Sequence, residues 1–299
     1  MEMGTDGKMS PKRSFEAALR RPAYLDGSAV GRYSFAAPGT RFPAFGSETV
    51  VLFVSDMHFG RGAKAEERAN EAALIECLEA HADQVDHLYL LGDVFDGYIE
   101  YKHLIPKGFV RVQGLIAAWT DRGIPITYLL GNHDPWHQDH FAEELGVDLV
   151  PDHLEVQHGP HRLHLTHGDA QASTHRGYDW VRPLLRHPWA LRLYRTLLPA
   201  DWGLALARTV SRALHEPEPD PAVVEALEAY AHRRLQAPGL DAVLMGHSHQ
   251  SSLQQWGRGV YVNTGNWYEN RTFARLEDGM LRLCRWNGSR TLDIESAAL

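Results

Sequence analysis

The sequence predicts an α/β sandwich, with parallel strands first and antiparallel strands later. Short apolar runs of strand length recur along the chain, at residues 49–55, 87–92, 125–131, 162–168 and 241–247. Helix-like segments at about 65–82 and 109–122 separate the first three runs, and this alternation is typical of a layered α/β domain. Between residues 252 and 286 the pattern changes to strands joined by tight turns, including an Asp-Gly hairpin signal at residues 278–279.

The composition excludes several classes of protein. The 299 residues allow one large domain or two modest ones, and 44% apolar with 23% charged residues is an ordinary globular balance. No apolar run of ~18 residues occurs, and the first twenty residues lack the apolar stretch of a secretory signal. Two cysteines, Cys77 and Cys284, fit a reducing compartment, and a net charge of −8 disfavours nucleic acid as a partner. We therefore expect a cytoplasmic globular protein.

Three regions differ in character. Residues 1–46 have little periodicity and scattered Gly, Pro and Ser, which predicts an irregular N-terminal extension. The strand-like runs place the core at 47–171 and 237–299. Between these parts, residues 172–236 carry helix-like segments rich in Leu, Ala, Trp and Arg, which predicts a helical insertion or cap. Its basic and aromatic residues fit either an apolar channel rimmed by arginine or an ordinary amphipathic hairpin with a solvated basic face.

Polar side chains follow each of the five strand-like runs at the point where the strand ends. Open α/β sheets place their active sites at the carboxyl ends of strands, and glycines beside several of these residues allow sharp turns there. The i, i+2 spacing in two of the blocks puts both side chains on one side of an extended backbone. The residues in question are Asp56 and His58, Asp93 and Asp96, Asn132 and His133, His167, and His247 and His249.

These residues predict a metal site. The donors are carboxylates, imidazoles and an amide carbonyl, with no thiolate. That mixed set suits Mn²⁺, Fe²⁺, Zn²⁺ or Mg²⁺ at two adjacent positions. Two such ions ~3.5–4 Å apart can clamp a phosphoryl group for in-line attack by an activated water.

The order of the blocks, D-x-H, G-D-x-x-D, G-N-H-D, H-G-D and G-H-x-H, resembles the calcineurin-like metallophosphoesterases over about residues 50–275. The resemblance implies a four-layer α/β/β/α sandwich with an inserted helical cap. It also implies that one metal is held by Asp56, His58, Asp93 and His249, and a second by the bridging Asp93 with Asn132, His167 and His247. In that family the histidine of G-N-H-D, here His133, stabilises the transition state or protonates the leaving group, and Asp96 would orient it.

Three segments look like the UDP-2,3-diacylglucosamine diphosphatase branch of the family: residues 92–111, the helical insertion, and residues 261–279. The resemblance implies hydrolysis of that lipid nucleotide to UMP and 2,3-diacylglucosamine 1-phosphate in lipid A synthesis, with manganese as the usual metal. The cap would hold the acyl chains, and the protein would dock peripherally on the anionic cytoplasmic face of the inner membrane. The substrate contacts that the resemblance implies are Asn132, His133, Tyr178, Ser211 and His247.

The chain departs from the better-known members of that branch at four positions. They carry Arg at the position of His133, and different residues at the positions of His175, His215 and Asn266. These differences leave the predicted ligands intact and bear on the substrate. The alternatives are therefore a metallophosphoesterase acting on a nucleotide, a phosphomonoester or a phosphoprotein, and, more remotely, a scaffold of the same fold without catalysis.

Overall fold

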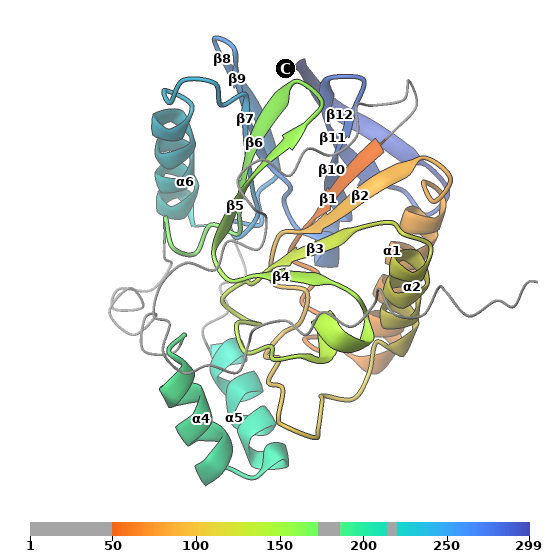
Figure 1. Cartoon of the computed structure of the whole chain (residues 1–299), viewed down its shortest axis with the longest axis vertical. Coiled ribbons are helices and arrows are strands. Elements are labelled where there is room, and N and C mark those ends of the chain that lie inside the picture. The colour runs from red at the N-terminus through yellow and green to blue at the C-terminus, as the bar shows by residue number, and fades with distance from the viewer. Residues whose placement is uncertain (1–49, 173–185, 214–219) are drawn as a thin grey trace, which may run out of the picture. The chain divides into compact units, whose positions relative to one another are not determined.

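The computed structural model describes residues 50–172, 186–213 and 220–299, and its first sheet carries the predicted parallel strands (Figure 1). Seven strands lie in the order β12-β11-β10-β1-β2-β3-β4. The parallel half consists of β1 (Val50–Val54), β2 (Val85–Leu90), β3 (Ile126–Leu129) and β4 (Asp148–Val150). The antiparallel half consists of β10 (Thr272–Glu277), β11 (Met280–Trp286) and β12 (Thr291–Ala298).

The second sheet has five strands in the order β5-β6-β7-β9-β8. Its strands are β5 (His153–His158), β6 (His161–Thr166), β7 (Ala242–Met245), β8 (Ser252–Trp256) and β9 (Gly259–Asn263). Strands β6, β7 and β9 are parallel, while β5 and β8 pair antiparallel at the two edges. Both sheets are therefore mixed: the parallel strands form one half of the first sheet and the middle of the second.

Strand β1 is buried on both faces, which explains its unbroken apolar sequence. Val50, Leu52 and Val54 pack under the helices α1 (Lys64–Glu79) and α2 (Val110–Asp121). Val51 and Phe53 point the other way, into a core shared with the second sheet. Successive side chains of a strand alternate between its faces, so a strand between two apolar layers has no polar positions.

A helix covers the outer face of the second sheet as well. Helix α6 (Pro221–Arg234) packs Val223, Leu227 and Ala231 against β7 and β9. It starts at Asp220, whose side chain accepts a hydrogen bond from the Ala222 amide at 2.8 Å. The layers run helices, sheet, sheet, helix, so the predicted four-layer α/β/β/α architecture is confirmed.

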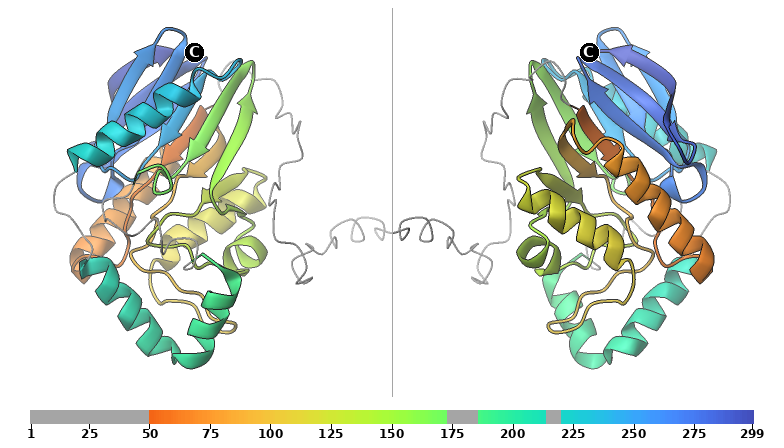
Figure 2. Two further views of the ribbon diagram at one scale, coloured as in Figure 1. Left: turned by 90° about the vertical axis from the view of Figure 1, so that its left-hand side faces the viewer. Right: turned by 90° about the vertical axis from the view of Figure 1, so that its right-hand side faces the viewer.

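Helix α6 lies within the predicted insertion at 172–236 and forms the outer layer of the sandwich. Helices α4 (Pro188–Leu197) and α5 (Ala200–Ala213) form a separate pair at the opposite end from β8 and β9 (Figure 2). The division of the chain into core and cap stays a prediction. The N-terminal extension at 1–46 lies outside the described residues.

The predicted hairpin at residues 278–279 is confirmed. Asp278 and Gly279 join β10 to β11 with φ angles of 51° and 72°, the left-handed conformation that a two-residue turn of this kind requires. The sequence did not predict β4, β5 or β12, the π-helical turn η1 (His140–Glu144), or the short helix α7 (Trp267–Asn270). In the described parts of the chain, no helix combines the length and the apolar character needed to cross a membrane.

Candidate metal centre

The structure brings the predicted donors of both sheets together at the carboxyl ends of β1, β2, β3, β6 and β7. Five of the seven predicted ligands have left-handed backbone, with φ between 45° and 68°: Asp56, His58, Asp93, His247 and His249. This conformation costs roughly 1–3 kcal/mol for a residue other than glycine and is concentrated at functional sites. The chain bends at these residues immediately after each strand, and the bends place their side chains beside one another.

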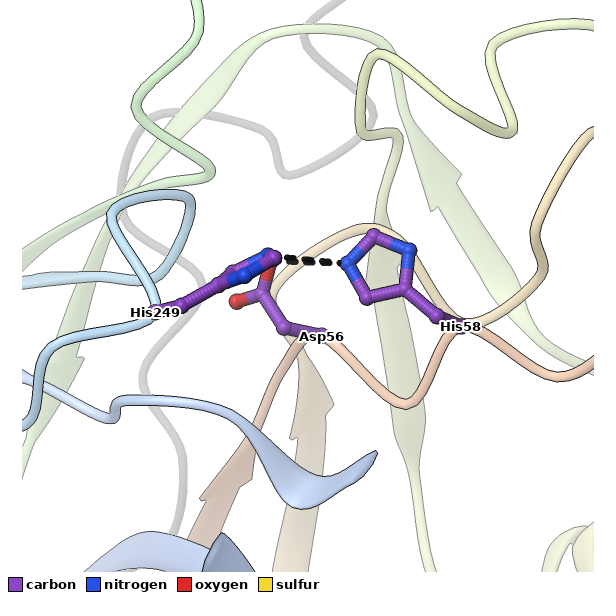
Figure 3. Close-up of side chains that lie close together, drawn as sticks. All are labelled: Asp56, His58 and His249. Atoms are coloured by element: carbon purple, nitrogen blue, oxygen red, sulfur yellow. Dashed lines mark hydrogen bonds and ion pairs between the residues drawn. The ribbon is translucent and has the colours of Figure 1, made fainter. Parts of the chain in front are cut away.

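A first group of donors consists of Asp56, His58 and His249 (Figure 3). The Nε2 atoms of the two imidazoles lie 2.9 Å apart. Asp56 Oδ1 lies 3.3 Å from His249 Nε2 and 3.7 Å from His58 Nε2. Three ligand atoms from two distant parts of the chain therefore converge on one point.

A second group lies beside the first. His167 Nε2 lies 3.4 Å from Asp93 Oδ2 and 3.0 Å from the amide oxygen of Asn132. The other ring nitrogen of His167 lies 2.8 Å from the carbonyl of Leu91, so the backbone fixes the ring with Nε2 toward the donors. Asp93 Oδ2 is also 3.9 Å from His58 Nε2. Asp93 thus lies between the two groups, where a bridging carboxylate is required.

His247 borders the second group. Its ring packs edge-on against that of His167, with centroids 5.1 Å apart. Its Nε2 lies 3.0 Å from the carbonyl oxygen of Ala172. A carbonyl accepts, so Nε2 donates and Nδ1 keeps the lone pair that a metal ligand needs.

The carboxylates of the centre are buried and ionised. Burial by itself would raise the pKa of Asp93, but His167 and His133 lower it below its usual range. The pKa of Asp56 is lowered in the same way, by the imidazoles beside it. Burial would lower the pKa of His167, yet the Asp93 carboxylate raises it to about 10. The site therefore requires compensating positive charge, because buried carboxylates are stable only when they are paired.

The residues fit divalent metal ions. Asp56 Oδ1 is buried and has no hydrogen-bond donor among the described residues, although two imidazole nitrogens lie within 4 Å of it. Nitrogen and oxygen donors with unused lone pairs that face one point are the ligand set that Mn²⁺, Fe²⁺ and Zn²⁺ accept. The grouping of Asp56, Asp93 and His167 links the two sets of donors into one cluster.

The predicted pair of His133 and Asp96 lies at the edge of this cluster. His133 Nδ1 is 3.2 Å from Asp96 Oδ1, and its Nε2 is 3.9 Å from Asp93 Oδ2. The His133 amide also donates to Asp93 Oδ1 at 2.8 Å. Burial would lower the pKa of His133, but the two carboxylates outweigh it and raise that pKa. The imidazole therefore presents Nε2 toward the metal centre and Nδ1 toward Asp96.

Two residues around Asp96 have contacts that the sequence did not predict. Arg61 donates to Asp96 Oδ1 from Nε at 3.3 Å and from Nη2 at 3.1 Å. Ser211, predicted as a substrate contact, is buried on α5 and donates to the same oxygen at 2.7 Å. Arg61 follows His58 by three residues, and this closeness to two predicted ligands in the sequence is the signal that could have identified it.

Asp134 holds the loops of the site together. Its carboxylate accepts hydrogen bonds from the amides of Gly131 at 2.9 Å, Phe95 at 3.1 Å and Asp93 at 3.3 Å, and from the hydroxyl of Tyr128. Burial, followed by the neighbouring Asp93 charge, raises the pKa of Asp134 to about 6. The side chain thus fixes the loop after β2 to the loop after β3, which carry different ligands.

Four further positions were singled out in the sequence, and the structure describes one of them, Asn266. Tyr178, His175 and His215 lie outside the described residues. Asn266 caps α7, where its side-chain oxygen accepts from the Glu269 amide at 3.0 Å and from the Asn270 amide at 3.1 Å. The asparagine at this position therefore has a structural explanation in the helix that follows it.

This fold and donor cluster are those of a metal-dependent phosphoester hydrolase. Residues 49–251 match the calcineurin-like phosphoesterase family, and the chain belongs to that family.

Within this family, the chain is similar to proteins named UDP-2,3-diacylglucosamine hydrolase. The chain is 34% identical over 162 residues to a UDP-2,3-diacylglucosamine hydrolase of Porphyromonas gingivalis, an alignment that covers 54% of this chain and 62% of the relative. It is 25% identical over 224 residues to the protein of that name from Haemophilus influenzae, covering 73% of this chain and 90% of the relative. The chain thus spans less than two thirds of the length of the Porphyromonas protein. Among solved structures it is similar to Yfce, a phosphoesterase from E. coli, at 17% identity and a TM-score of 0.44, covering 84% of this chain and 99% of that one.

Proposed function

We propose that this protein hydrolyses the diphosphate of UDP-2,3-diacylglucosamine and releases UMP and 2,3-diacylglucosamine 1-phosphate. The convergence of a complete set of nitrogen and oxygen donors on two adjacent points carries the chemistry. The names of the relatives from Porphyromonas gingivalis and Haemophilus influenzae support the substrate. The scaffold alternative is disfavoured because the ligand set is intact.

The residues divide between two metal positions as the family resemblance implies. Asp56, His58 and His249 would hold one ion, Asn132, His167 and His247 the other, and Asp93 would contact both. Two bound divalent ions would neutralise phosphate charge and lower the pKa of a water molecule to make it a nucleophile. We propose Mn²⁺, which the imidazole, carboxylate and amide donors suit and which is usual in the branch that the sequence resembles.

The protein's own contribution is to orient groups around the phosphate. His133 presents Nε2 at the edge of the donor cluster, where in its protonated form it stabilises negative charge on the phosphoryl oxygens or gives its proton to the leaving group. Asp96 holds the opposite nitrogen and so fixes the ring. Both carboxylates beside His133 favour the protonated ring, because they raise its pKa.

The lipid part of the substrate would lie at α4 and α5. Their exposed apolar side chains include Trp189, Leu193, Leu197 and Trp202, which are 49–73% exposed. Exposed apolar patches of this kind mark interaction sites for lipid, membrane or protein. We propose that this face accepts acyl chains and rests on the cytoplasmic surface of an anionic membrane without spanning it.

The test is a Mn²⁺-dependent assay on three substrates with the same diphosphate or diester chemistry: UDP-2,3-diacylglucosamine, UDP-N-acetylglucosamine, and a chromogenic phosphodiester. His133→Ala and Asp93→Ala are expected to lose turnover of the lipid nucleotide, whereas His232→Ala, an exposed histidine on α6, is the matched control. Strong turnover of the lipid nucleotide with UMP as product supports the proposal. Turnover of the chromogenic ester alone would keep the metal site and discard the lipid substrate.

A further inference from the structure

The hydrogen bonds of Ser211 suggest a role different from substrate contact. Its hydroxyl oxygen lies 2.6 Å from His133 Nδ1 and 2.7 Å from Asp96 Oδ1. These three residues come from three separate elements, namely α5 and the loops after β3 and β2. The hydroxyl of Ser211 thus contacts both members of the predicted pair, the imidazole of His133 and the carboxylate of Asp96.

The donors and acceptors of this contact can be counted. A serine hydroxyl has one hydrogen, and Ser211 gives it to Asp96, because a carboxylate can only accept. The contact with His133 must then use a lone pair of the serine oxygen, so Nδ1 of the imidazole carries a proton and donates. The direct approach of Nδ1 to Asp96 Oδ1 at 3.2 Å requires the same proton. Every contact on that side of the ring therefore specifies Nδ1–H and turns Nε2 toward the metal centre.

Helix α5 is seated closely enough on the core to hold this geometry. A Cβ on Gly97, which follows Asp96 and has a φ of 77°, would lie 3.3 Å from the backbone nitrogen of Arg208. At the other end of the helix, a Cβ on Gly203 would meet the hydroxyl of Tyr101. Ser211 follows Arg208 by three residues, about one helical turn, so the tight contact at Gly97 sets the position of the hydroxyl.

We propose that Ser211 is a positioning residue, which orients His133 by accepting from Nδ1 and donating to Asp96 while α5 is seated on the core. It acts through His133 and Asp96. The site is then complete only when α5 is in place, and the helix pair that presents the exposed apolar face also completes the hydrogen bonding of the reacting group. The inference deepens the proposed function and rests on it for the reaction, but the orientation of His133 can be measured without any reaction.

The first measurement is made on the metal-free protein. Long-range ¹H–¹⁵N spectra of histidine-labelled protein report which ring nitrogen carries the proton, and His133→Ala identifies the signal of His133. In the unchanged protein we expect a protonated Nδ1. At a pH where the ring is neutral, we expect Ser211→Ala to weaken this preference for Nδ1, and Ser211→Thr, which keeps the hydroxyl, to retain it. Thr209→Ala is the matched control, because among the described residues its hydroxyl donates only to the Ala205 carbonyl of the same helix.

The second measurement is steady-state hydrolysis with Mn²⁺, on the lipid nucleotide and on the chromogenic diester. Ser211→Ala is expected to lower kcat ~10–100-fold with little change in KM, as removal of an orienting partner does, while Ser211→Thr retains most of the rate. If Ser211→Ala is too unstable to purify, Ser211→Cys fills the position with a slightly larger side chain and replaces the hydroxyl with a weak donor. Because hydrolysis of the chromogenic diester does not require the lipid, its rate tests the role of Ser211 even if the proposed lipid substrate is wrong.

Two results would overturn the proposal. One is an unchanged His133 spectrum in Ser211→Ala, because the hydroxyl would then have no influence on the ring. The other is a rise in KM at constant kcat for the lipid nucleotide alone, which would return Ser211 to the substrate contact that the sequence predicts. Failure of the lipid nucleotide to react in the unchanged protein, with normal spectra and diester hydrolysis, would count against the proposed substrate and leave the positioning role supported.

Discussion

Arg61 and Asp96 meet in a two-donor hydrogen bond beside the metal centre, with Nε 3.3 Å and Nη2 3.1 Å from the same carboxylate oxygen. The same Nη2 lies 2.9 Å from Nδ1 of His58, and the guanidinium carbon is 5.9 Å from the ring centroid of Tyr268. Arg61 therefore contacts both a predicted ligand and Asp96, the carboxylate that we propose orients His133. It joins the two parts of the site through one side chain.

Arg61→Ala is expected to lower kcat by ~10–100-fold, the usual loss when the partner of a ligand or of an orienting group is removed. Arg61→Lys should recover only part of this loss, because a lysine cannot reproduce the planar, multiple-donor contact. Arg68→Ala changes an exposed arginine on α1 and should leave kcat unchanged. Full activity in Arg61→Ala would show that the contact with Asp96 has no part in the reaction.

The cluster of donors could be predicted because each predicted ligand lies within a few residues of the end of a recognisable buried strand. Asp56 and His58, for example, follow an apolar run that reads as a strand without any tertiary information. The contacts of Arg61 and Ser211 could not be predicted, because they join loops and helices that are far apart in the sequence and meet only in the folded chain. Ser211 is 115 positions from Asp96.

The missed elements of the fold have similar causes. Strand β12 has exposed residues along most of its length and β5 alternates exposed with partly or fully buried ones, so neither shows the continuous apolar run that revealed β1. The apolar positions of α6 predicted a helix but not the surface that it covers. Helix α6 lies in the outer layer because Val223 and Leu227 pack against the second sheet, a contact that the sequence of the helix alone does not reveal.

Asp134→Asn is expected to destabilise the folded protein by roughly 1–3 kcal/mol, the cost of leaving a buried polar group without its partner. The carboxylate accepts from three backbone amides, and an asparagine would present an N–H group to at least one of them. Urea unfolding of the metal-free protein measures the change, with Asp121→Asn at the exposed end of α2 as the control. Equal unfolding midpoints for both variants would contradict the role given to Asp134.

His137 should make the protein less stable in mild acid. The ring is buried between Tyr98 and Phe141, and neither nitrogen has a hydrogen-bond partner among the described residues. Burial, followed by the charges of His140 and Arg195, lowers its pKa from 6.5 to about 3. Between these pH values the unfolded chain binds a proton that the folded chain does not. The contribution of the neutral His137 ring to stability is therefore complete above the pKa that this histidine has in the unfolded chain. It is lost progressively as the pH falls below that value.

The measurement is the free energy of unfolding of the metal-free protein and of its His137→Phe variant at pH 7 and pH 5. One histidine of this kind lowers the free energy of unfolding by about 2 kcal/mol between pH 7 and pH 5. We therefore expect the drop in the free energy of unfolding to be smaller by that amount in His137→Phe than in the unchanged protein. Exposed His232→Phe is the control and should follow the unchanged protein. An identical acid dependence for His137→Phe and the unchanged protein would contradict the assignment.

Removal of the metal should lower thermal stability, because the buried carboxylates of Asp56 and Asp93 then lack their compensating charge. An ion present at a hundred times its dissociation constant stabilises the folded state by about 2.7 kcal/mol for each site. We expect Mn²⁺ to raise Tm in the unchanged protein and less so in Asp56→Asn, whereas Asp83→Asn, an exposed aspartate, responds normally. An equal rise in Tm for Asp56→Asn would place the ion elsewhere.

The most direct test of the two-metal hydrolase is a titration of the metal-free protein with Mn²⁺, in which bound metal and hydrolysis of UDP-2,3-diacylglucosamine are measured on the same samples. The arrangement of Asp93 between two groups of donors predicts that turnover saturates at two ions per chain, and that Asp93→Asn loses both the stoichiometry and the rate. Maximal turnover at one ion or none, or two bound ions without release of UMP, would contradict it.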